Sequence, residues 1–154
     1  MQVMTTDTRA YMDVDIADVG QQMYSGRCLS LVAPAAFGEV CILPRHAPFL
    51  SKLNPGEIRL ETDRNERFIY YVSGGYLEVK NSTVTVLADQ MLRSNEIDRQ
   101  AAEAAKAKAE QLLKTSASDS VRDVAKLELV KALAQLRVLE HTEMAKLQNK
   151  HRYK

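Results

Sequence analysis

The sequence predicts an α+β protein in which an N-terminal antiparallel β-sandwich is followed by a C-terminal antiparallel hairpin of two helices. Three observations support this fold class. From Met12 to about Ala88, apolar residues recur at every second position or in short runs, with turn residues between them. From Arg93 onward the apolar residues recur with the period of a helix. Glycine, which weakens helices, is absent from this second part.

The first strand is the clearest of the predicted strands. Met12, Val14 and Ile16 alternate with Asp13 and Asp15, so one face of this strand is apolar and the other is expected to be exposed to solvent. Short apolar runs then predict further strands: Leu29 and Leu31, Val40 and Ile42, Ile58 and Leu60, Phe68–Val72, Tyr76–Val79, and Val84–Leu87.

Turn residues separate these runs. Asn54-Pro55-Gly56 predicts a type II turn, because proline presets φ and glycine supplies the positive φ that follows. Residues 63–66 and 80–82 are predicted to be the tips of hairpins. Ser73-Gly74-Gly75, between two apolar runs, indicates a bulge or a close approach of two backbones.

The first helix is predicted over about residues 95–114, with Asn95 and Asp98 in the pattern of a capping box. Its apolar side chains are mostly small, which gives high helix propensity but little area to bury. A helix of this kind can approach a neighbouring backbone closely. The alanines are Ala101, Ala102, Ala104, Ala105, Ala107 and Ala109.

The second helix is predicted over about residues 120–148, with Ser120 and Asp123 as its cap. Leu129, Leu133 and Leu136 form one apolar stripe, which can pack on the first helix. A neighbouring stripe is left over and needs the sandwich or a partner to cover it. This second stripe consists of Leu127, Val130, Ala134 and Val138.

The predicted domain boundaries follow from these elements. Residues 1–11 form an N-terminal extension, 12–92 the sandwich, 93–150 the helical hairpin and 151–154 a tail. A net charge of +1 gives no basic field for nucleic acid. Without a long apolar run or a secretory signal, the chain is expected to be soluble and cytosolic. Cys28 and Cys41 are then expected to be buried small hydrophobic residues without a disulfide.

The sequence offers little for catalysis. It has no glycine-rich phosphate loop, no nucleophile elbow and no C-x-x-C pair. Its three histidines, His46, His141 and His151, lie far apart and are not spaced as metal ligands. We therefore expect no catalytic residue, no metal site, no cofactor and no independent enzyme activity.

Two features leave alternatives open. His46 lies between Pro44 and Pro48 on a stiff turn, where it either bonds to nearby backbone carbonyls or forms an exposed polar contact. Residues 121–154 carry eight basic and four acidic side chains. These cations are either a solvated helix face or a docking surface for an acidic partner. The candidate docking residues are Arg122, Lys126, Lys131 and Arg137.

Motifs in both halves resemble the ε subunit family of bacterial F-type ATP synthases, whose mitochondrial counterpart is called δ. The resemblance covers about residues 12–150 and rests on spaced motifs in the family's order. They are Gln22–Gly26, the stretch Gly38-Glu39-x-x-Ile42-Leu43-Pro44-x-His46-Ala47-Pro48, Leu53-x-Pro55-Gly56, Val72–Val79, Val84–Asp89 and Leu133–Val138.

The resemblance implies a sandwich of about ten strands and a non-catalytic subunit of the central rotor. Its implied partners are the γ subunit, the ring of c subunits and the catalytic α/β head, with no nucleic acid. The chain would lie at the cytoplasmic face of the bacterial inner membrane and meet the membrane only through the complex. Loop residues matching Glu39, Arg45 and His46 would face the ring. The helical hairpin would restrain ATP hydrolysis, with its basic second helix meeting an acidic segment of the β subunit.

This sequence departs from the family's pattern at two places. Some members bind ATP through a motif Ile/Leu-Asp-x-x-Arg-Ala. Here Ile97, Asp98, Ala101 and Ala102 occupy the four specified positions, so alanine replaces the arginine and weak or absent nucleotide binding is expected. Arg45 stands where the family commonly has glycine, so the backbone geometry of that turn can differ from the family's.

The residues alone also allow a function of another class. A free-standing β-sandwich interaction module, whose helices self-associate through the surplus apolar stripe, would fit the same pattern. Binding to a γ subunit separates the rotor subunit from this module.

Overall fold

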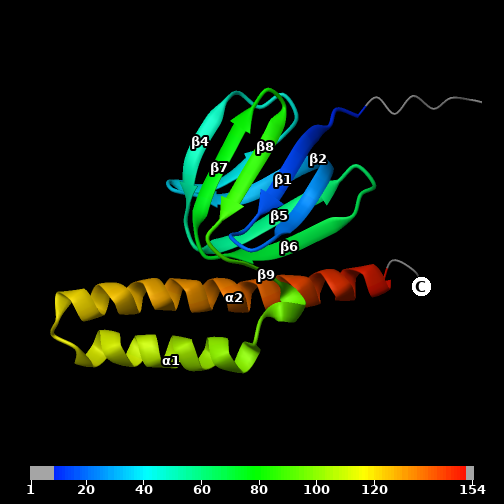
Figure 1. Cartoon of the computed structure of the whole chain (residues 1–154). Coiled ribbons are helices and arrows are strands. Elements are labelled where there is room, and N and C mark those ends of the chain that lie inside the picture. The colour runs from blue at the N-terminus through cyan, green and yellow to red at the C-terminus, as the bar shows by residue number, and fades with distance from the viewer. Residues whose placement is uncertain (1–8, 152–154) are drawn as a thin grey trace, which may run out of the picture.

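The computed structural model describes residues 9–151, so most of the predicted N-terminal extension and of the tail lie outside it. Nine strands precede two long helices in the described chain, and Figure 1 shows the sandwich lying along the helical hairpin. The strands are β1 (Met12–Ala17), β2 (Gln22–Ala35), β3 (Gly38–Ile42), β4 (Phe49–Leu53), β5 (Gly56–Thr62), β6 (Arg67–Val72), β7 (Gly75–Lys80), β8 (Thr83–Ala88) and β9 (Met91–Arg93).

The strands follow the order β1-β8-β7-β4-β2-β5-β6-β9, with β3 beside β2 and an additional pairing of β1 with β2. All pairs are antiparallel except β1 and β8, which run parallel. The predicted antiparallel sandwich is confirmed apart from that pair. Its core is apolar, and the alternation in β1 is as expected, with Met12, Val14 and Ile16 at most 2% exposed.

Nine strands are found in the described chain where about ten were expected, and the longest of them is β2. It spans 14 residues and pairs with β1 over its first half and with β3, β4 and β5 over its second half. A register shift between Cys28 and Ser30 changes which side chains point inward. Cys28 and Leu31 are therefore fully buried, whereas Leu29 is only half-buried. The apolar run at Leu29 and Leu31 does lie in a strand, but this bulge keeps the two side chains from being equally buried.

Two predicted hairpin tips are confirmed. Asn65 has φ 59° between β5 and β6, and Asn81 and Ser82 have φ 49° and 63° between β7 and β8. Asparagine tolerates this left-handed region better than most residues.

The predicted type II turn at 54–56 is wrong, because Gly56 is not among the glycines with positive φ and instead begins β5. A Cβ on Gly56 would lie 2.7 Å from the Pro34 side chain, so glycine permits close packing there.

The helices begin and end close to the predicted limits. A 3₁₀ turn, η1 (Ser94–Glu96), precedes α1 (Arg99–Thr115), and α2 (Asp119–His151) follows a short connection. The N-cap of α1 is Asp98, whose carboxylate accepts a hydrogen bond from the Ala101 amide at 3.1 Å, so the predicted Asn95 cap is wrong. The predicted start of α2 at Ser120 is late, because the Arg122 amide already bonds to the Ser118 carbonyl at 3.0 Å.

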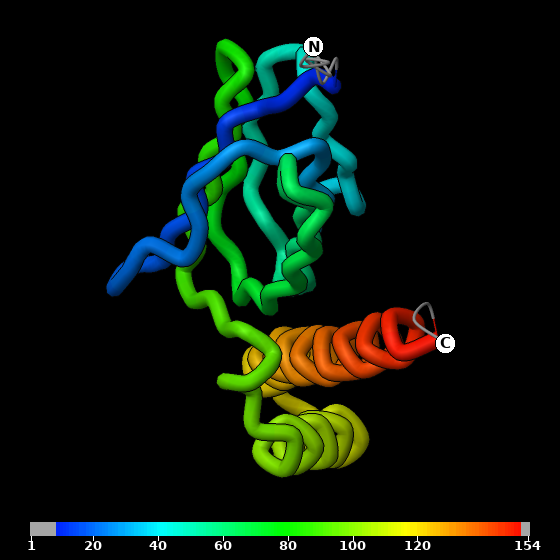
Figure 2. The backbone as a smooth tube through the Cα atoms, turned by 90° about the vertical axis from the view of Figure 1, so that its right-hand side faces the viewer, coloured from blue at the N-terminus to red at the C-terminus, as the bar shows by residue number. Residues whose placement is uncertain are grey.

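The molecule has three layers, in which α2 lies between the sandwich and α1 (Figure 2). α2 packs on β5 and β6, and α1 packs on α2. No helix within residues 9–151 is long and apolar enough to cross a membrane. Cys28 is buried as expected, but Cys41 is exposed because it lies on the outward face of β3.

The predicted close approach at Ser73-Gly74-Gly75 is confirmed. Gly75 has φ 132°, and a Cβ there would lie 2.1 Å from the Leu87 carbonyl oxygen. Gly38 has the same φ of 132°, but a Cβ there would meet no described atom within 4 Å.

These two glycines allow a matched test of backbone crowding. Gly38→Ala is expected to lower the free energy of unfolding by about 1–3 kcal/mol through φ alone. Gly75→Ala is expected to lose a further 1–3 kcal/mol, roughly, because the methyl group overlaps β8. Urea denaturation measures both, and equal losses in the two variants would contradict the close approach.

Candidate functional site at the sandwich–hairpin junction

Small side chains hold the two helices together. Ala102 and Ala109 of α1 and Ala125 and Ala132 of α2 are each at most 3% exposed. These alanines let the helices pack closely while burying little apolar area per residue. The predicted role of the alanines is therefore confirmed.

An apolar cluster joins α2 to the sandwich. Val138 is fully buried and Ala134 is 5% exposed, and both lie against Tyr71 of β6 and Ile97, which follows η1. Burial raises the pKa of the Tyr71 phenol, although a hydrogen bond with Gln135 opposes this shift. Ile69, Leu92 and Leu139 complete the edge of the cluster.

A buried carboxylate lies beside this cluster. Glu57 of β5 is only 5% exposed, and both of its oxygens lie within hydrogen-bond distance of His141 Nδ1 on α2, at 2.8 and 2.9 Å. Arg59, two residues further along β5, also donates to the Glu57 carboxylate. A buried carboxylate without partners would be strongly unfavourable, so these contacts fix the position of α2 on β5.

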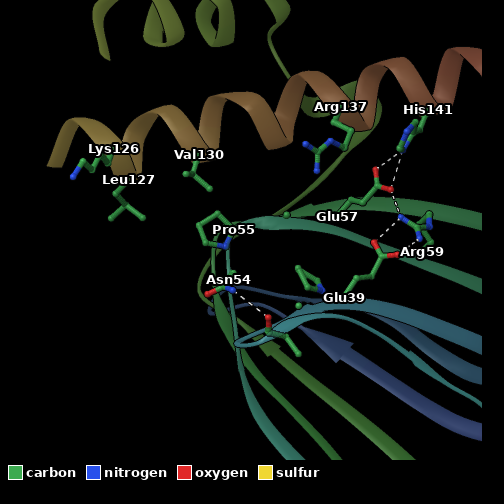
Figure 3. A pocket seen from close by; sticks show the side chains of 14 residues that line it. Glu39, Asn54, Pro55, Glu57, Arg59, Lys126, Leu127, Val130, Arg137 and His141 are labelled. Carbon is green, nitrogen blue, oxygen red and sulfur yellow. Dashed lines mark hydrogen bonds and ion pairs between the residues drawn. The ribbon is translucent and has the colours of Figure 1, made fainter. Parts of the chain in front are cut away.

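The ion-pair network continues to β3. Arg59 binds both carboxylate oxygens of Glu39, at 2.9 and 3.2 Å, so one guanidinium bridges two carboxylates (Figure 3). These contacts raise the pKa of the Arg59 guanidinium, and its hydrogen bond with Glu39 is the largest cause. The result is a chain of contacts from β3 through β5 to α2, formed by Glu39, Arg59, Glu57 and His141.

The other two predicted loop residues lie on the turn after β3. The His46 amide bonds to the Leu43 carbonyl at 3.1 Å, and Arg45 has φ 67°. Pro44 and Arg45 thus occupy the central positions of a turn that requires positive φ at its second one, as type II turns do. Glycine adopts this φ without strain, which explains why Arg45 is a departure at this position.

His46 shows the first of the two alternatives left open by the sequence, a bond to a nearby backbone carbonyl, and an exposed polar contact with a partner stays a prediction. Its ring is exposed, its Nδ1 lies 2.7 Å from the Ala47 carbonyl, and it meets Phe49 edge-on at 5.8 Å. Glu39 is also exposed in part, but its ion pair leads to Arg59 and not to the turn that carries Arg45 and His46.

The four predicted docking cations lie on α2 in different surroundings. Arg122 bonds to the Leu113 carbonyl at the end of α1, and Lys131 lies 3.6 Å from Glu128. Lys126 and Arg137 line a cavity of about 920 Å³ between α2 and the sandwich. Figure 3 shows the Arg137 side chain pointing from α2 into this gap.

The degenerate nucleotide motif lines another cavity, of about 410 Å³, between α1, α2 and β6. Ile97 is buried in the apolar cluster, Asp98 caps α1, and Ala101 and Ala102 form part of the wall. The charged side chains in the described wall are Glu96, Asp98, Glu128 and Lys131, and the lysine pairs with Glu128. This wall is unsuited to a triphosphate, because carboxylates outnumber cations.

The sequence analysis does not predict Glu57 or Arg59 as site residues. It treats His141 only as one of three widely separated histidines. The available signal was the alternation of charged Glu57, Arg59 and Glu61 on one face of a predicted strand. Because three consecutive residues of β5 from Gly56 are buried, that strand is covered on both faces. Only the docking of α2 shows which charged residue it covers.

Comparisons with known proteins identify the family. The family model "ATP synthase, Delta/Epsilon chain, beta-sandwich domain" matches residues 11–94, and its partner "long alpha-helix domain" matches residues 95–140. An ATP synthase epsilon chain from Halorhodospira halophila is 45% identical over 130 residues, which are 84% of this chain and 92% of that protein. One from Alkalilimnicola ehrlichii is 43% identical over 129 residues, with the same coverage of 84% and 92%. The chain therefore belongs to the ATP synthase delta/epsilon chain family, and the resemblance found in the motifs is confirmed.

Solved structures support the fold. A chain in the mitochondrial ATP synthase of Euglena gracilis aligns with a TM-score of 0.76 at 19% identity, covering 84% of this chain and 82% of that chain. A chain in the central stalk and c-ring structure of Tetrahymena thermophila mitochondrial ATP synthase aligns with a TM-score of 0.57 at 15% identity, covering 83% and 96%.

The contact between Glu57 and His141 can be tested by exchange of backbone amides. His141→Ala is expected to make amide exchange along the middle of α2 about 3- to 10-fold faster, because part of the docking energy is lost. The effect is moderate because the His141 side chain is 41% exposed. His151→Ala is the matched control, since His151 lies on the same helix and its ring bonds to the Leu147 carbonyl of that helix and to no other described residue. Equal exchange in the two variants would contradict the contact.

The charge of the cavity beside α1 predicts its response to nucleotide. Calorimetry with ATP is expected to give no binding in the submillimolar range. Ala101→Arg places a cation in the wall and is expected to produce measurable binding, whereas Ala104→Arg, on an exposed position outside this wall, is not. Submillimolar binding to the unmodified chain would contradict the expectation.

Proposed function

We propose that this chain is a non-catalytic subunit of the central stalk of an F-type ATP synthase. Family membership supports this proposal, as do relatives that are named ATP synthase epsilon chain. In this proposal the subunit binds γ and the c ring and helps to couple proton flow to ATP synthesis in the catalytic α/β head. It is peripheral, at the cytoplasmic face of the inner membrane, and the exposed turn with Arg45 and His46 faces the ring together with Glu39.

The sandwich suits the transmission of torque. Its core side chains are almost fully buried in one cluster, and β1 closes onto both β2 and β8. Close-packed interiors deform little under load. The rotor function therefore belongs to residues of the sandwich, which can act without the hairpin.

The helical hairpin restrains ATP hydrolysis when it leaves the sandwich. The observation that carries this part is the small junction, which consists of Tyr71, Ile97, Ala134 and Val138 with the Glu57–His141 contact. Each large apolar side chain contributes about 1.5–3 kcal/mol. Moving a population from 1:99 to 99:1 requires about 5.5 kcal/mol, so a competing surface on the head can match this junction.

The docked arrangement also leaves cations available for the head. Lys126 and Arg137 form no ion pair with any residue in the described part of the chain, and Arg122 bonds to the Leu113 carbonyl near the end of α1. These side chains, together with Lys131, are the proposed contacts with an acidic segment of the catalytic β subunit.

Binding and truncation test the two parts separately. The chain is expected to co-elute with the γ subunit of its organism at one to one in gel filtration. Removal of residues after Asn95 should leave this binding intact and raise the ATPase activity of the assembled head. A homodimer that does not bind γ would instead favour the self-associating interaction module. Unchanged ATPase activity after truncation would remove the regulatory function and leave the rotor function in place.

A further inference from the structure

The junction leaves a groove unfilled. The cavity of about 920 Å³ runs between α2 and the sandwich, where its floor includes Pro34, Pro55 and Gly56. Leu127 and Val130 of α2 line its other side and are 47% and 45% exposed. A second cavity, of about 450 Å³, continues past Pro55 and Leu127 toward Tyr76.

The apolar stripe of α2 explains why this groove exists. Ala134 and Val138 lie on the stripe that faces the sandwich and are buried by β6. Leu127 and Val130 continue the same side of the helix toward its N-terminus, where they line the cavity and stay about half exposed. The N-terminal end of α2 extends past the sandwich (Figure 1). The chain therefore presents apolar side chains toward its own sandwich without covering them.

The charges around the groove are not balanced. Glu39 and Glu57 are both satisfied by Arg59, and Glu57 also by His141. Lys126 and Arg137 line the same cavity, and no other residue in the described chain forms an ion pair or hydrogen bond with either side chain. They lie eleven positions apart on α2, which is about 16 Å along the helix axis. Leu127 and Val130 lie between the two cations in the sequence of α2.

We propose that this groove binds an extended segment of a partner polypeptide that carries apolar side chains between two carboxylates. Six residues of extended chain span roughly 20 Å. Two carboxylates six positions apart point to the same side and can reach Lys126 and Arg137, since all four side chains are long. The apolar residues between them, on the same face, would cover Val130, Leu127 and Pro55.

Such a segment would also act on the hairpin. It contacts α2 and the sandwich together, so it binds only the docked arrangement and stabilises that arrangement over the extended one. This consequence rests on the proposed function, whereas the binding site itself does not. A small carboxylate would pair with one cation only and would leave the rest of the groove uncovered.

The test uses the isolated full-length chain and a defined probe, the peptide acetyl-Glu-Thr-Leu-Ala-Leu-Thr-Glu-amide. In a nuclear magnetic resonance titration at low ionic strength, the amide shifts are expected at Val130, Leu127 and Gly56. Arg137→Glu and Lys126→Glu should each weaken binding by about 3- to 10-fold. Lys146→Glu, which reverses a charge of α2 outside the groove, should leave peptide binding unchanged. Circular dichroism should show that all three variants keep the fold.

Several outcomes would overturn the proposal. They are no binding, equal binding of a peptide with lysines in place of both glutamates, or shifts confined to the exposed Leu50, Tyr76 and Leu87. Octanoate that binds in the groove as tightly as the peptide would show a small-molecule site instead. Concentration-dependent shifts without peptide would show that a second copy of the chain fills the groove. None of these outcomes depends on ATPase activity, so they are distinguishable from failure of the proposed rotor function.

Discussion

Burial of the Glu57 carboxylate between β5 and α2 determines how the two domains are arranged. A carboxylate can lie in this position only while its oxygens are paired, and here Arg59 comes from its own strand and His141 from the hairpin. The apolar contacts of Val138 and Tyr71 are less directional, so this polar contact selects the register of α2. In the proposed detachment of α2, Arg59 would still pair with Glu57, so the carboxylate would not be left without a partner.

The two parts of the molecule differ in how they are packed. The sandwich buries its core almost completely, with each core side chain at most 6% exposed, and its strands close around that core. The hairpin is joined to it by the short segment around η1 and by one face of α2. Within residues 9–151, α1 packs mainly on α2, and buried alanines hold that pair together. The rotor subunit with a regulatory arm that we propose would require a stiff body and a pair of helices that can detach.

Much of this fold could be predicted from the sequence, because the apolar period changes once, near Arg93, and turn residues mark the strands. The alternation in β1 and the hairpin tips at Asn65 and Asn81 depend on local chemistry that is visible in the chain. The bulge in β2 could not be predicted, since the apolar pattern around Leu29 fits either register. The Glu57–His141 contact could not be predicted from the sequence either, because it joins residues 84 positions apart and depends on how α2 docks on β5.

Detachment of the hairpin can be measured as a distance between the two domains in the assembled ATP synthase. Spin labels at Leu87→Cys of β8 and Val124→Cys of α2, in a chain with Cys41→Ser, report the position of the hairpin by pulsed electron paramagnetic resonance. We expect one distance in the isolated chain and a second, longer distance in the assembled complex when ATP hydrolysis is inhibited. His141→Ala should increase the share of the longer distance. A single unchanged distance under all these conditions would contradict a hairpin that leaves the sandwich.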